Sequence, residues 1–471
     1  MFRSRAFKSI LPYLIAAGDL FLIVTGYGVA FYFRFYGHVP TENREPFIQA
    51  IPWIGLVTLL FFTGLGLYQF RRDGFTFLLR GVITGVLGMT VTTMALTFWF
   101  RGFAFPRSVF IFALPIQMVL VCAWRYFFWH LERWLYGRRK LLLVGNCSET
   151  EAVLNKLFNL PHGWFEIQYV LTPEDLTRLP SFLSQVDAVL VAPSLAREEK
   201  AIILSVCLEE RREAYLVPDI YDILLSRSSM LQFDDLPVVE VQDIRLTWLQ
   251  RETKRALDLA LAGPGLLTSL PLMIVCALAI KATSPGPVFY LQKRVGYRGY
   301  SFMLYKFRTM IKDAEKITGP ILSKEKDPRV TPVGRFLRST CLDELPQLLN
   351  VIKGEMSIVG PRPERPFFVQ QFTGEMPDYR YRYLVKPGLT GLAQVYGRYT
   401  TSAAEKLCYD LYYIRNYSIW LDLKIMLQTI PIALGGRGAR GRKKEINPDK
   451  QAFINTLVNS AHQTAAGKEG Q

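Results

Sequence analysis

Two adjacent carboxylates, Asp343 and Glu344, are the residues in this sequence best suited to covalent chemistry. The residues after them predict a helix over 345–352, with Asp343 as its N-cap and Pro346 in its first turn. A carboxylate at this position meets unpaired backbone N–H groups and the positive end of the helix, so we expect it to be ionised. An ionised, fixed aspartate can attack phosphorus and form an aspartyl-phosphate type intermediate.

Basic side chains near these carboxylates are candidates for binding phosphate, because arginine can hold phosphate oxygens bidentately. Arg335 and Arg338 precede the pair, and Arg362 follows it. Lys306 and Arg308 fall on one face of a predicted strand by the period of two, which suits a diphosphate. A simpler interpretation is equally good in each case. The carboxylates and the arginines near them could be an acidic N-cap with a solvated basic rim. The two cations of the predicted strand could be solvated charges on an edge strand.

The elements that must position these residues begin at residue 284. Residues 288–294 and 301–310 alternate as two strands, and the glycines at 296 and 299 predict a hairpin turn between them. Residues 404–434 predict two helices rich in tyrosine, which suit a membrane interface or core packing about equally. We expect residues 284–435 to be a small α/β catalytic domain, followed by a basic, flexible tail over residues 436–471.

Residues 1–135 predict a domain of four transmembrane helices. Hydrophobic residues make up 50% of the 471-residue chain and gather mostly in this region. Lysines and arginines gather at alternate ends of the apolar stretches, so both ends of the domain are expected in the cytoplasm. Three charged residues, Asp19, Arg34 and Arg125, are expected to pair within the bundle or to reach the interface. The stretches that reach the roughly 20 residues needed to cross a bilayer are 10–33, 47–70, 77–100 and 109–129.

Charge and rare residues narrow the chemistry further. The net charge of +16 favours anionic lipid headgroups or phosphorylated substrates. The sequence has no sequence-specific nucleic-acid module, so we expect no nucleic-acid partner. Its six cysteines include no CxxC pair, which argues against a zinc site or a disulfide framework. No histidine lies between His162 and His462, so the C-terminal half must work without one.

Residues 136–250 alternate between strand and helix patterns, which predicts a parallel, Rossmann-like sheet. The turn after the first strand holds a single glycine, Gly145, where a dinucleotide fingerprint needs three. We therefore expect no dinucleotide here, but a spacer, regulatory or dimerisation role. The predicted strands are 140–144, 167–171, 187–192 and 214–217.

A second apolar stretch lies within residues 251–283 and is long enough to span a membrane. Gly263-Pro264-Gly265 and Pro271 interrupt it. If it crossed the bilayer, everything after it would leave the cytoplasm. We expect instead a re-entrant helix that breaks, with Pro271 as the structural break, and returns to the same face.

Residues 251–430 resemble the bacterial sugar transferases, which are polyprenyl-phosphate hexose-1-phosphate transferases or monotopic phosphoglycosyl transferases. The motifs stand in the family's order and are together highly specific. The four spans and the Rossmann-like domain before them resemble the long form of that family. One departure is Cys341, where the family usually has serine. The matching motifs are Lys254-Arg255-x-x-Asp258, Ser284–Tyr290, Lys306–Met310, Asp327–Thr331, Leu342–Gln347, Lys353–Ser357, Val359–Pro363 and Pro387–Gly391.

This resemblance implies a phosphotransferase that moves hexose-1-phosphate from a UDP-hexose to polyprenyl (undecaprenyl) phosphate and releases UMP. UDP-glucose or UDP-galactose is the family's usual donor. The reaction would be the first membrane step of exopolysaccharide, capsule or O-antigen (lipopolysaccharide) synthesis. Asp343 would be the nucleophile, forming an aspartyl-phosphosugar intermediate, and Glu344 would assist, with both residues binding Mg²⁺. The residues expected to bind substrate are Lys306, Arg308, Arg335, Arg338, Arg362 and Pro363.

The same resemblance places the chain in the bacterial inner membrane as a multi-pass protein with its catalytic domain in the cytoplasm. There it would contact membrane lipids, and we expect a homodimer. Membrane-bound nucleotide-sugar dehydratases and epimerases resemble the N-terminal half, but they need TGxxGxxG and YxxxK motifs. Thr84–Gly88 lies inside a predicted span and Tyr136–Lys140 at a membrane junction, so we reject that alternative. A third alternative is an inactive membrane scaffold, against which the intact Asp343 and Glu344 argue.

Overall fold

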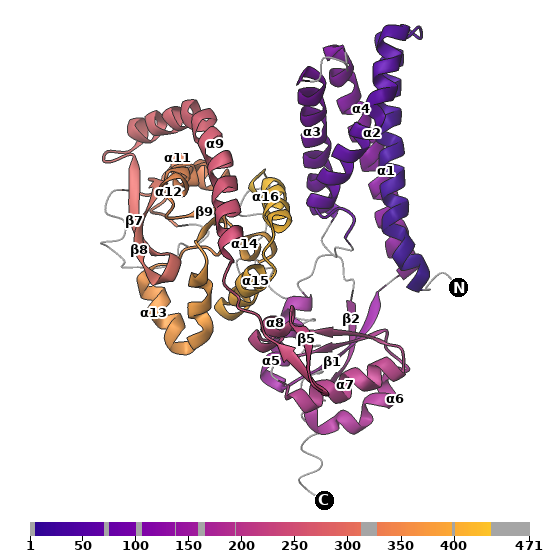
Figure 1. Ribbon diagram of the computed structural model, residues 1–471, viewed down its shortest axis with the longest axis vertical. Coiled ribbons are helices and arrows are strands. Elements are labelled where there is room, and N and C mark those ends of the chain that lie inside the picture. Colours follow the sequence, from indigo (N-terminus) through magenta and orange to yellow (C-terminus); the bar gives the residue numbers. More distant parts are fainter. Residues whose placement is uncertain are drawn as a thin grey trace, which may run out of the picture. The chain divides into compact units, whose positions relative to one another are not determined.

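The chain folds into two compact units, which meet in the sequence between Asp219 and Ile220. Figure 1 shows the computed structural model. The predicted tail over residues 436–471 lies outside the described part of the chain. The structure describes residues 5–69, 75–99, 106–136, 138–158, 165–193, 195–311, 327–397 and 401–434.

Four long apolar helices open the first unit and match the predicted spans (Figure 1). They are α1 (Arg5–Arg34), α2 (Thr41–Gly64), α3 (Phe75–Trp99) and α4 (Arg107–Tyr136). Helix α1 packs on α4, and α3 packs on both α2 and α4. Asp19 and Arg125 form a buried ion pair between α1 and α4, while Arg34 Nε donates to Ser108 Oγ at 2.7 Å. Asp19 and Arg125 are therefore paired within the bundle, one of the two expected outcomes, while Arg34 is exposed at the end of α1.

The rest of the first unit contains a four-stranded parallel sheet in the order β2-β1-β3-β4, which confirms the predicted parallel sheet. Its elements are β1 (Arg139–Val144), α5 (Cys147–Phe158), β2 (Phe165–Leu171), η1 (Pro173–Arg178), α6 (Leu179–Leu183), β3 (Ala188–Val191), α7 (Arg197–Glu209) and β4 (Glu213–Leu216). Leu142 and Val144 face one apolar core, and Leu141 and Leu143 face another. Both faces of β1 are buried, which explains its unbroken apolar run.

The second unit begins before the predicted boundary at residues 250/251. Its first elements are α8 (Ile220–Leu225) and the antiparallel hairpin of β5 (Ser229–Phe233) and β6 (Leu236–Glu240). Ile223 and Leu246 are buried in one core with Leu411 of α15 (Ala403–Arg415). Arg415 Nη1 donates to the Gln242 carbonyl at 2.8 Å. Residues 220–250 therefore pack with the C-terminal half of the chain.

Helix α9 (Trp248–Thr283) is a continuous helix of 36 residues, so the predicted interruption is wrong as a break in helical structure. Figure 1 shows α9 as two arms joined at a bend. Its internal prolines, Pro264 and Pro271, each lack a backbone donor and can bend a helix without ending it. Between the two prolines, the Thr268 hydroxyl donates to the Pro264 carbonyl at 2.9 Å.

The remaining elements build a small α/β core around two two-stranded sheets. Strands β7 and β8 pair antiparallel from Phe289 with Phe307 to Val295 with Ser301, which confirms the predicted hairpin. Strands β9 and β10 pair in parallel. The elements are β7 (Phe289–Val295), η2 (Tyr297–Gly299), β8 (Ser301–Phe307), α11 (Pro332–Ser339), η3 (Leu342–Glu344), α12 (Gln347–Lys353), β9 (Ser357–Val359), α13 (Pro366–Glu375), η4 (Pro377–Leu384), β10 (Gly388–Thr390), α14 (Leu392–Tyr396) and α16 (Ile419–Leu434).

Candidate active site

Asp343 and Glu344 are both buried and lie in the short 3-10 turn η3, before α12 begins. The predicted N-cap role of Asp343 is wrong. An N-cap side chain accepts from the backbone two or three residues on. Here the Leu345 N–H donates to the Leu342 carbonyl at 3.2 Å, and Pro346 has no N–H to offer. Asp343 thus belongs to the turn before the helix and does not cap the helix.

The turn depends on an unusual backbone conformation at Cys341. This residue has φ +60°, in the left-handed region that residues with a side chain seldom enter. Its carbonyl accepts from the Glu344 N–H at 3.2 Å, which closes the turn. Strained conformations of this kind gather at functional sites. Nothing in the sequence marked Cys341 except its departure from the family's serine.

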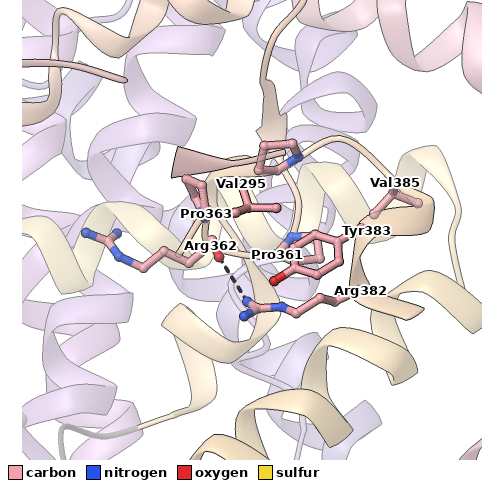
Figure 2. A pocket seen from close by; sticks show the side chains of 8 residues that line it. Val295, Pro361, Arg362, Pro363, Arg382, Tyr383 and Val385 are labelled. Carbon is pink, nitrogen blue, oxygen red and sulfur yellow. Dashed lines mark hydrogen bonds between the residues drawn. The ribbon is translucent and has the colours of Figure 1, made fainter. Parts of the chain in front are cut away.

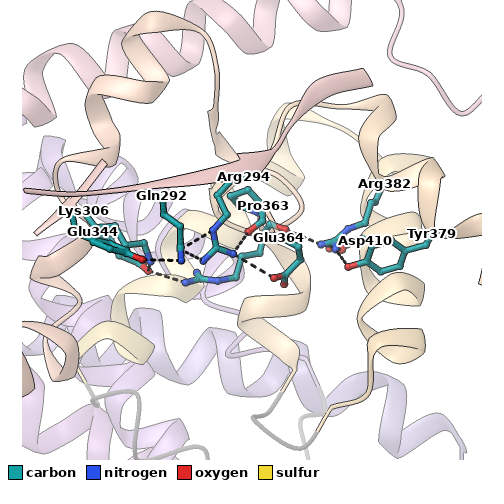
Figure 3. A network of polar contacts seen from close by, with 11 residues as sticks. Gln292, Arg294, Lys306, Glu344, Pro363, Glu364, Tyr379, Arg382 and Asp410 are labelled. Atoms are coloured by element: carbon teal, nitrogen blue, oxygen red, sulfur yellow. Dashed lines mark hydrogen bonds and ion pairs between the residues drawn. The ribbon is translucent and has the colours of Figure 1, made fainter. Parts of the chain in front are cut away.

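Glu344 pairs with two cations, one from a strand and one from the segment between β9 and α13, and Figure 3 shows Lys306 beside it. Its Oε1 accepts from Lys306 Nζ of β8 at 3.0 Å and from Arg362 Nη2 at 2.9 Å. Burial lowers the pKa of Lys306, and the nearby charges of Glu344 and Asp343 act in the opposite direction. The structure therefore brings four predicted residues, Asp343, Glu344, Lys306 and Arg362, into one cluster.

The other predicted residues lie elsewhere. Arg308 is buried, and its guanidinium donates to the carbonyls of Ser284 at 2.7 Å and Pro285 at 2.8 Å. It therefore binds the start of the domain, while Lys306 reaches Glu344, although both belong to one predicted strand face. Arg338 Nε donates to Thr309 Oγ1 at 2.8 Å, and Arg335 is exposed on α11. Their parts in substrate binding stay predictions.

Two side chains fix α12, the helix that follows the carboxylate pair. Buried Asn350 donates to the Met303 carbonyl at 2.8 Å and accepts from the Tyr305 N–H at 3.1 Å, which ties α12 to the edge of β8. Arg255 of α9 donates to the carbonyls of Val351 at 2.6 Å and Ile352 at 2.7 Å. Carbonyls at a helix C-terminus need such donors. The helix that follows the carboxylate pair is thus held by a strand and by α9.

A further buried network joins α9 to the rest of the domain. Lys254 Nζ donates to Asp422 Oδ2 at 2.6 Å, and the Tyr413 hydroxyl donates to the other carboxylate oxygen at 2.8 Å. Asp258 Oδ1 accepts from Ser357 Oγ and from the Ile358 N–H, both at 2.9 Å. Lys254 and Asp258 were visible in the sequence only as part of the quoted motif, because their partners lie about 100 residues or more away in the sequence.

The segment that carries Arg362 and Pro363 lies over a small pocket (Figure 2). Backbone passes close to backbone here, since a Cβ on Gly388 would stand 2.1 Å from the Gly360 nitrogen. Position 388 therefore requires glycine because a side chain would clash with the neighbouring backbone, and not because of a turn conformation. The residues lining the pocket are Val295, Pro361, Arg362, Pro363, Arg382, Tyr383, Val385 and Pro387.

The carboxylate pair has the donors that a magnesium ion uses beside a phosphate substrate. Mg²⁺ is usually bound by one or two carboxylates together with substrate phosphates and water, not by a cage of protein ligands. Across the described ranges, no group of three or more His, Cys, Asp or Glu side chains could hold a metal ion. Asp343 and Glu344 fit the two-carboxylate kind of site.

Comparison with known proteins gives consistent matches. The model of a family described as bacterial sugar transferase matches residues 249–436. Over 460 residues the chain is 30% identical to a UDP-glucose:undecaprenyl-phosphate glucose-1-phosphate transferase of Klebsiella pneumoniae, covering 91% of this chain and 96% of that protein. The protein of the same name from Escherichia coli K12 is 42% identical over 221 residues, covering 46% of this chain and 47% of that protein.

A third relative acts on a different sugar by name. It is the UDP-N-acetylgalactosamine-undecaprenyl-phosphate N-acetylgalactosaminephosphotransferase of Aeromonas hydrophila, 46% identical over 190 residues. That alignment covers 40% of this chain and 45% of the relative. The chain thus spans about half the length of the Escherichia coli and Aeromonas hydrophila relatives, and nearly the whole of the Klebsiella pneumoniae one.

Proposed function

The chain belongs to the bacterial sugar transferase family, and on that premise we propose that it transfers hexose-1-phosphate from a UDP-hexose to polyprenyl phosphate and releases UMP. The observation that carries the proposal is the buried pair Asp343 and Glu344 beside the cations Lys306 and Arg362. This cluster offers a nucleophile and positive charge for a diphosphate within one small site. The relatives' names make glucose and N-acetylgalactosamine two sugars to test first.

In the first step, an Asp343 carboxylate oxygen attacks the sugar-linked phosphorus of the UDP-hexose. A bond forms between that oxygen and phosphorus, the bond to the bridging oxygen breaks, and UMP leaves with that oxygen. Lys306 and Arg362, which both donate to Glu344, would hold diphosphate oxygens while charge moves to UMP. Glu344 keeps both cations oriented and supplies a second carboxylate.

In the second step, a phosphate oxygen of the lipid attacks the same phosphorus and the Asp343 carboxylate is released. The product is polyprenyl-diphospho-hexose, so the carboxylate is regenerated and no water is consumed. Asp343 and Glu344 would hold Mg²⁺ together with the substrate phosphates. When bound, that ion neutralises diphosphate charge and makes UMP a better leaving group.

We also propose that α9 is re-entrant and keeps the catalytic domain on the cytoplasmic face of the bacterial inner membrane. Both arms of the helix support this. Near its start, Lys254 pairs with Asp422 of α16, and near its end, Ile280 packs in a core with Phe307 and Leu337. Both arms are thus tied to one small domain. Apolar side chains on the other side of the helix are exposed, for example Leu267 at 71%, and suit lipid.

The test is an incubation of purified protein with polyprenyl phosphate, Mg²⁺ and a panel of UDP-glucose, UDP-galactose and UDP-N-acetylgalactosamine, with UMP as the readout. We expect UMP release with at least one donor, and only when Asp343 is intact. Asp343→Asn should lose several factors of ten in rate, each worth about 1.4 kcal/mol, because an amide is not a competent nucleophile. An absence of UMP with every sugar would leave the inactive-scaffold alternative standing.

A trapping experiment identifies the nucleophile directly. Wild-type protein given UDP-hexose labelled in the sugar, without lipid acceptor, should keep the label on the peptide that contains Asp343. Addition of polyprenyl phosphate should then remove it. Label on a different residue, or near-normal turnover by Asp343→Asn, would show that the assignment of Asp343 is wrong.

A further inference from the structure

Two guanidinium groups, one buried (Arg382) and one half-buried (Arg294), hold consecutive carbonyls of the segment that carries Arg362 (Figure 3). Arg382 Nη2 donates to the Arg362 carbonyl at 2.9 Å, and Arg294 Nη1 donates to the Pro363 carbonyl at 3.0 Å. The Glu364 carbonyl accepts from the Val295 N–H at 3.0 Å. Three successive carbonyls of this segment are therefore fixed from outside it.

Arg382 is enclosed by groups that suit a permanent cation. It is 5% exposed and forms an ion pair with Asp410 of α15 at 2.8 Å. Its guanidinium lies over the Tyr379 ring, 4.7 Å from the centroid, and also donates to the Tyr379 hydroxyl. A buried pair of this kind costs desolvation and is weak evidence for stability alone. A role beyond stability is therefore worth seeking.

The backbone offers a direct route from this pair to the candidate site. Arg382 binds the carbonyl of the same residue, Arg362, whose side chain reaches Glu344 at 2.9 Å. The Arg362 side chain is 36% exposed, so its own surroundings hold it only in part. Where its guanidinium lies thus depends on where its backbone is held.

We propose that Arg382, held by Asp410, is a positioning residue that sets the Arg362 guanidinium against Glu344 and the diphosphate of the donor. This deepens the proposed function and rests on it. Arginine suits the task because its planar donor fork can bind a carboxylate and a carbonyl together while it stacks on a ring. Lysine keeps the charge but loses that geometry. A displacement of about 1 Å at a reacting centre can cost on the order of a hundredfold in rate.

The test is a double-mutant cycle on the full chain, with Arg382→Lys, Arg362→Ala and both together, assayed by UMP release. We expect Arg382→Lys to raise the KM for UDP-hexose by about tenfold or more, while the KM for polyprenyl phosphate stays near that of the wild type. A smaller folded fraction would lower kcat but leave both KM values unchanged. If Arg382 acts through Arg362, the double variant should be no worse than Arg362→Ala.

Arg380→Lys is the matched control, because Arg380 is an exposed arginine in the same turn η4. It should leave both KM values and the melting temperature near those of the wild type. Asp410→Asn is a second probe, because asparagine has nearly the shape of aspartate without its charge. It should raise the KM for UDP-hexose, as Arg382→Lys should. Additive losses in the cycle, or a fall in kcat with unchanged KM, would overturn the positioning role. If the wild-type protein releases no UMP, the proposed function itself is overturned. That result comes from the wild-type assay alone and needs no variant.

Discussion

At the scale of single residues, the candidate site depends on a buried carboxylate that serves two cations. Glu344 Oε1 is shared by Lys306 and Arg362, which are 38 and 18 residues away in the sequence. Removing one partner of a buried charge cluster leaves the other charges uncompensated, which is costly. Glu344 is therefore the shared counter-charge of two cations beside the proposed nucleophile.

We predict that Glu344→Gln lowers turnover by about a hundredfold, since both cations lose their shared charge and about 2.7 kcal/mol of transition-state stabilisation goes with it. The Mg²⁺ concentration for half-maximal UMP release should also rise, because one of the two carboxylates is lost. A magnesium titration of the purified variant measures both effects. Glu375→Gln, at an exposed position at the end of α13, is the control. An unchanged magnesium requirement in Glu344→Gln would count against metal binding by this residue.

The pair of Asp410 and Arg382 predicts a dependence on pH. Burial raises the pKa of Asp410 to about 6, although Arg382 acts against this. The native state then holds that proton more tightly than the unfolded chain does. The contribution of Asp410 to stability is therefore present at low pH and is lost as pH rises through about 6. Ionisation in the same range gives Arg382 its counter-charge.

Stability and activity should thus change in opposite directions around pH 6. We expect UMP release by the wild type to fall as pH drops below about 6, with an acid limb that Asp410→Asn lacks. The melting temperature of the wild type, relative to Asp410→Asn, should fall as pH rises from about 4 to 7. The charged and titratable groups that face the pair are Glu364, Tyr379, Tyr383 and Lys406. Parallel pH profiles for the two proteins would contradict this account.

At the scale of elements, α9 is the proposed link between the membrane and the candidate site. Its start is held by Lys254 and Asp258, and its Arg255 holds the end of α12. Two prolines inside the helix allow the bend that Figure 1 shows. If α9 is re-entrant as proposed, a bent helix with both arms on one domain would hold the site at the headgroup level. There a soluble UDP-sugar and a lipid phosphate can meet.

Cysteine labelling in cells tests this geometry. In a chain without native cysteines, single cysteines placed at Glu252 and Thr283 flank the apolar part of α9. We expect both to be shielded from an impermeant reagent added outside intact cells, and both to react after permeabilisation. Labelling at Thr283 alone in intact cells would falsify the re-entrant arrangement.

At the scale of the whole molecule, the two units suggest separate tasks. The turn after β1 has one glycine, and we propose that the Rossmann-like part of the first unit supplies no catalytic group. The second unit contains the whole cluster around Asp343. It also contains α8 and the β5–β6 hairpin, which lie before the predicted boundary. The homodimer expected from the resemblance stays a prediction.

Two truncated chains distinguish these contributions. A fragment that begins at Ile220 should release UMP in nanodiscs, because it keeps the unit intact. A fragment that begins at Gln250 loses the buried side chains of Ile223 and Leu246, worth about 1.5–3 kcal/mol each, and should melt at a lower temperature. A well-folded Ile220 fragment without activity would show that the first unit takes part in the reaction. Equal melting temperatures would contradict the packing argument.

The sequence alone determined the features that depend on local pattern. Four apolar stretches, the buried strands of the parallel sheet and the β7–β8 hairpin all follow from periodicity and turn residues, which neighbours in sequence decide. The family also follows from residue types and spacing alone, because the adjacent carboxylates and the motifs around them are short, contiguous stretches of chain.

Only the tertiary structure decided which side chains meet. Asp343 is not an N-cap because η3 uses the Leu345 N–H and Pro346 has none. Arg308 binds the carbonyls of Ser284 and Pro285 while Lys306 reaches Glu344, although their spacing is that of one strand face. No local sequence pattern indicated that Arg382 and Asp410 form a pair. Such contacts join residues far apart in the chain, and their energies depend on burial and on partners that packing alone brings together.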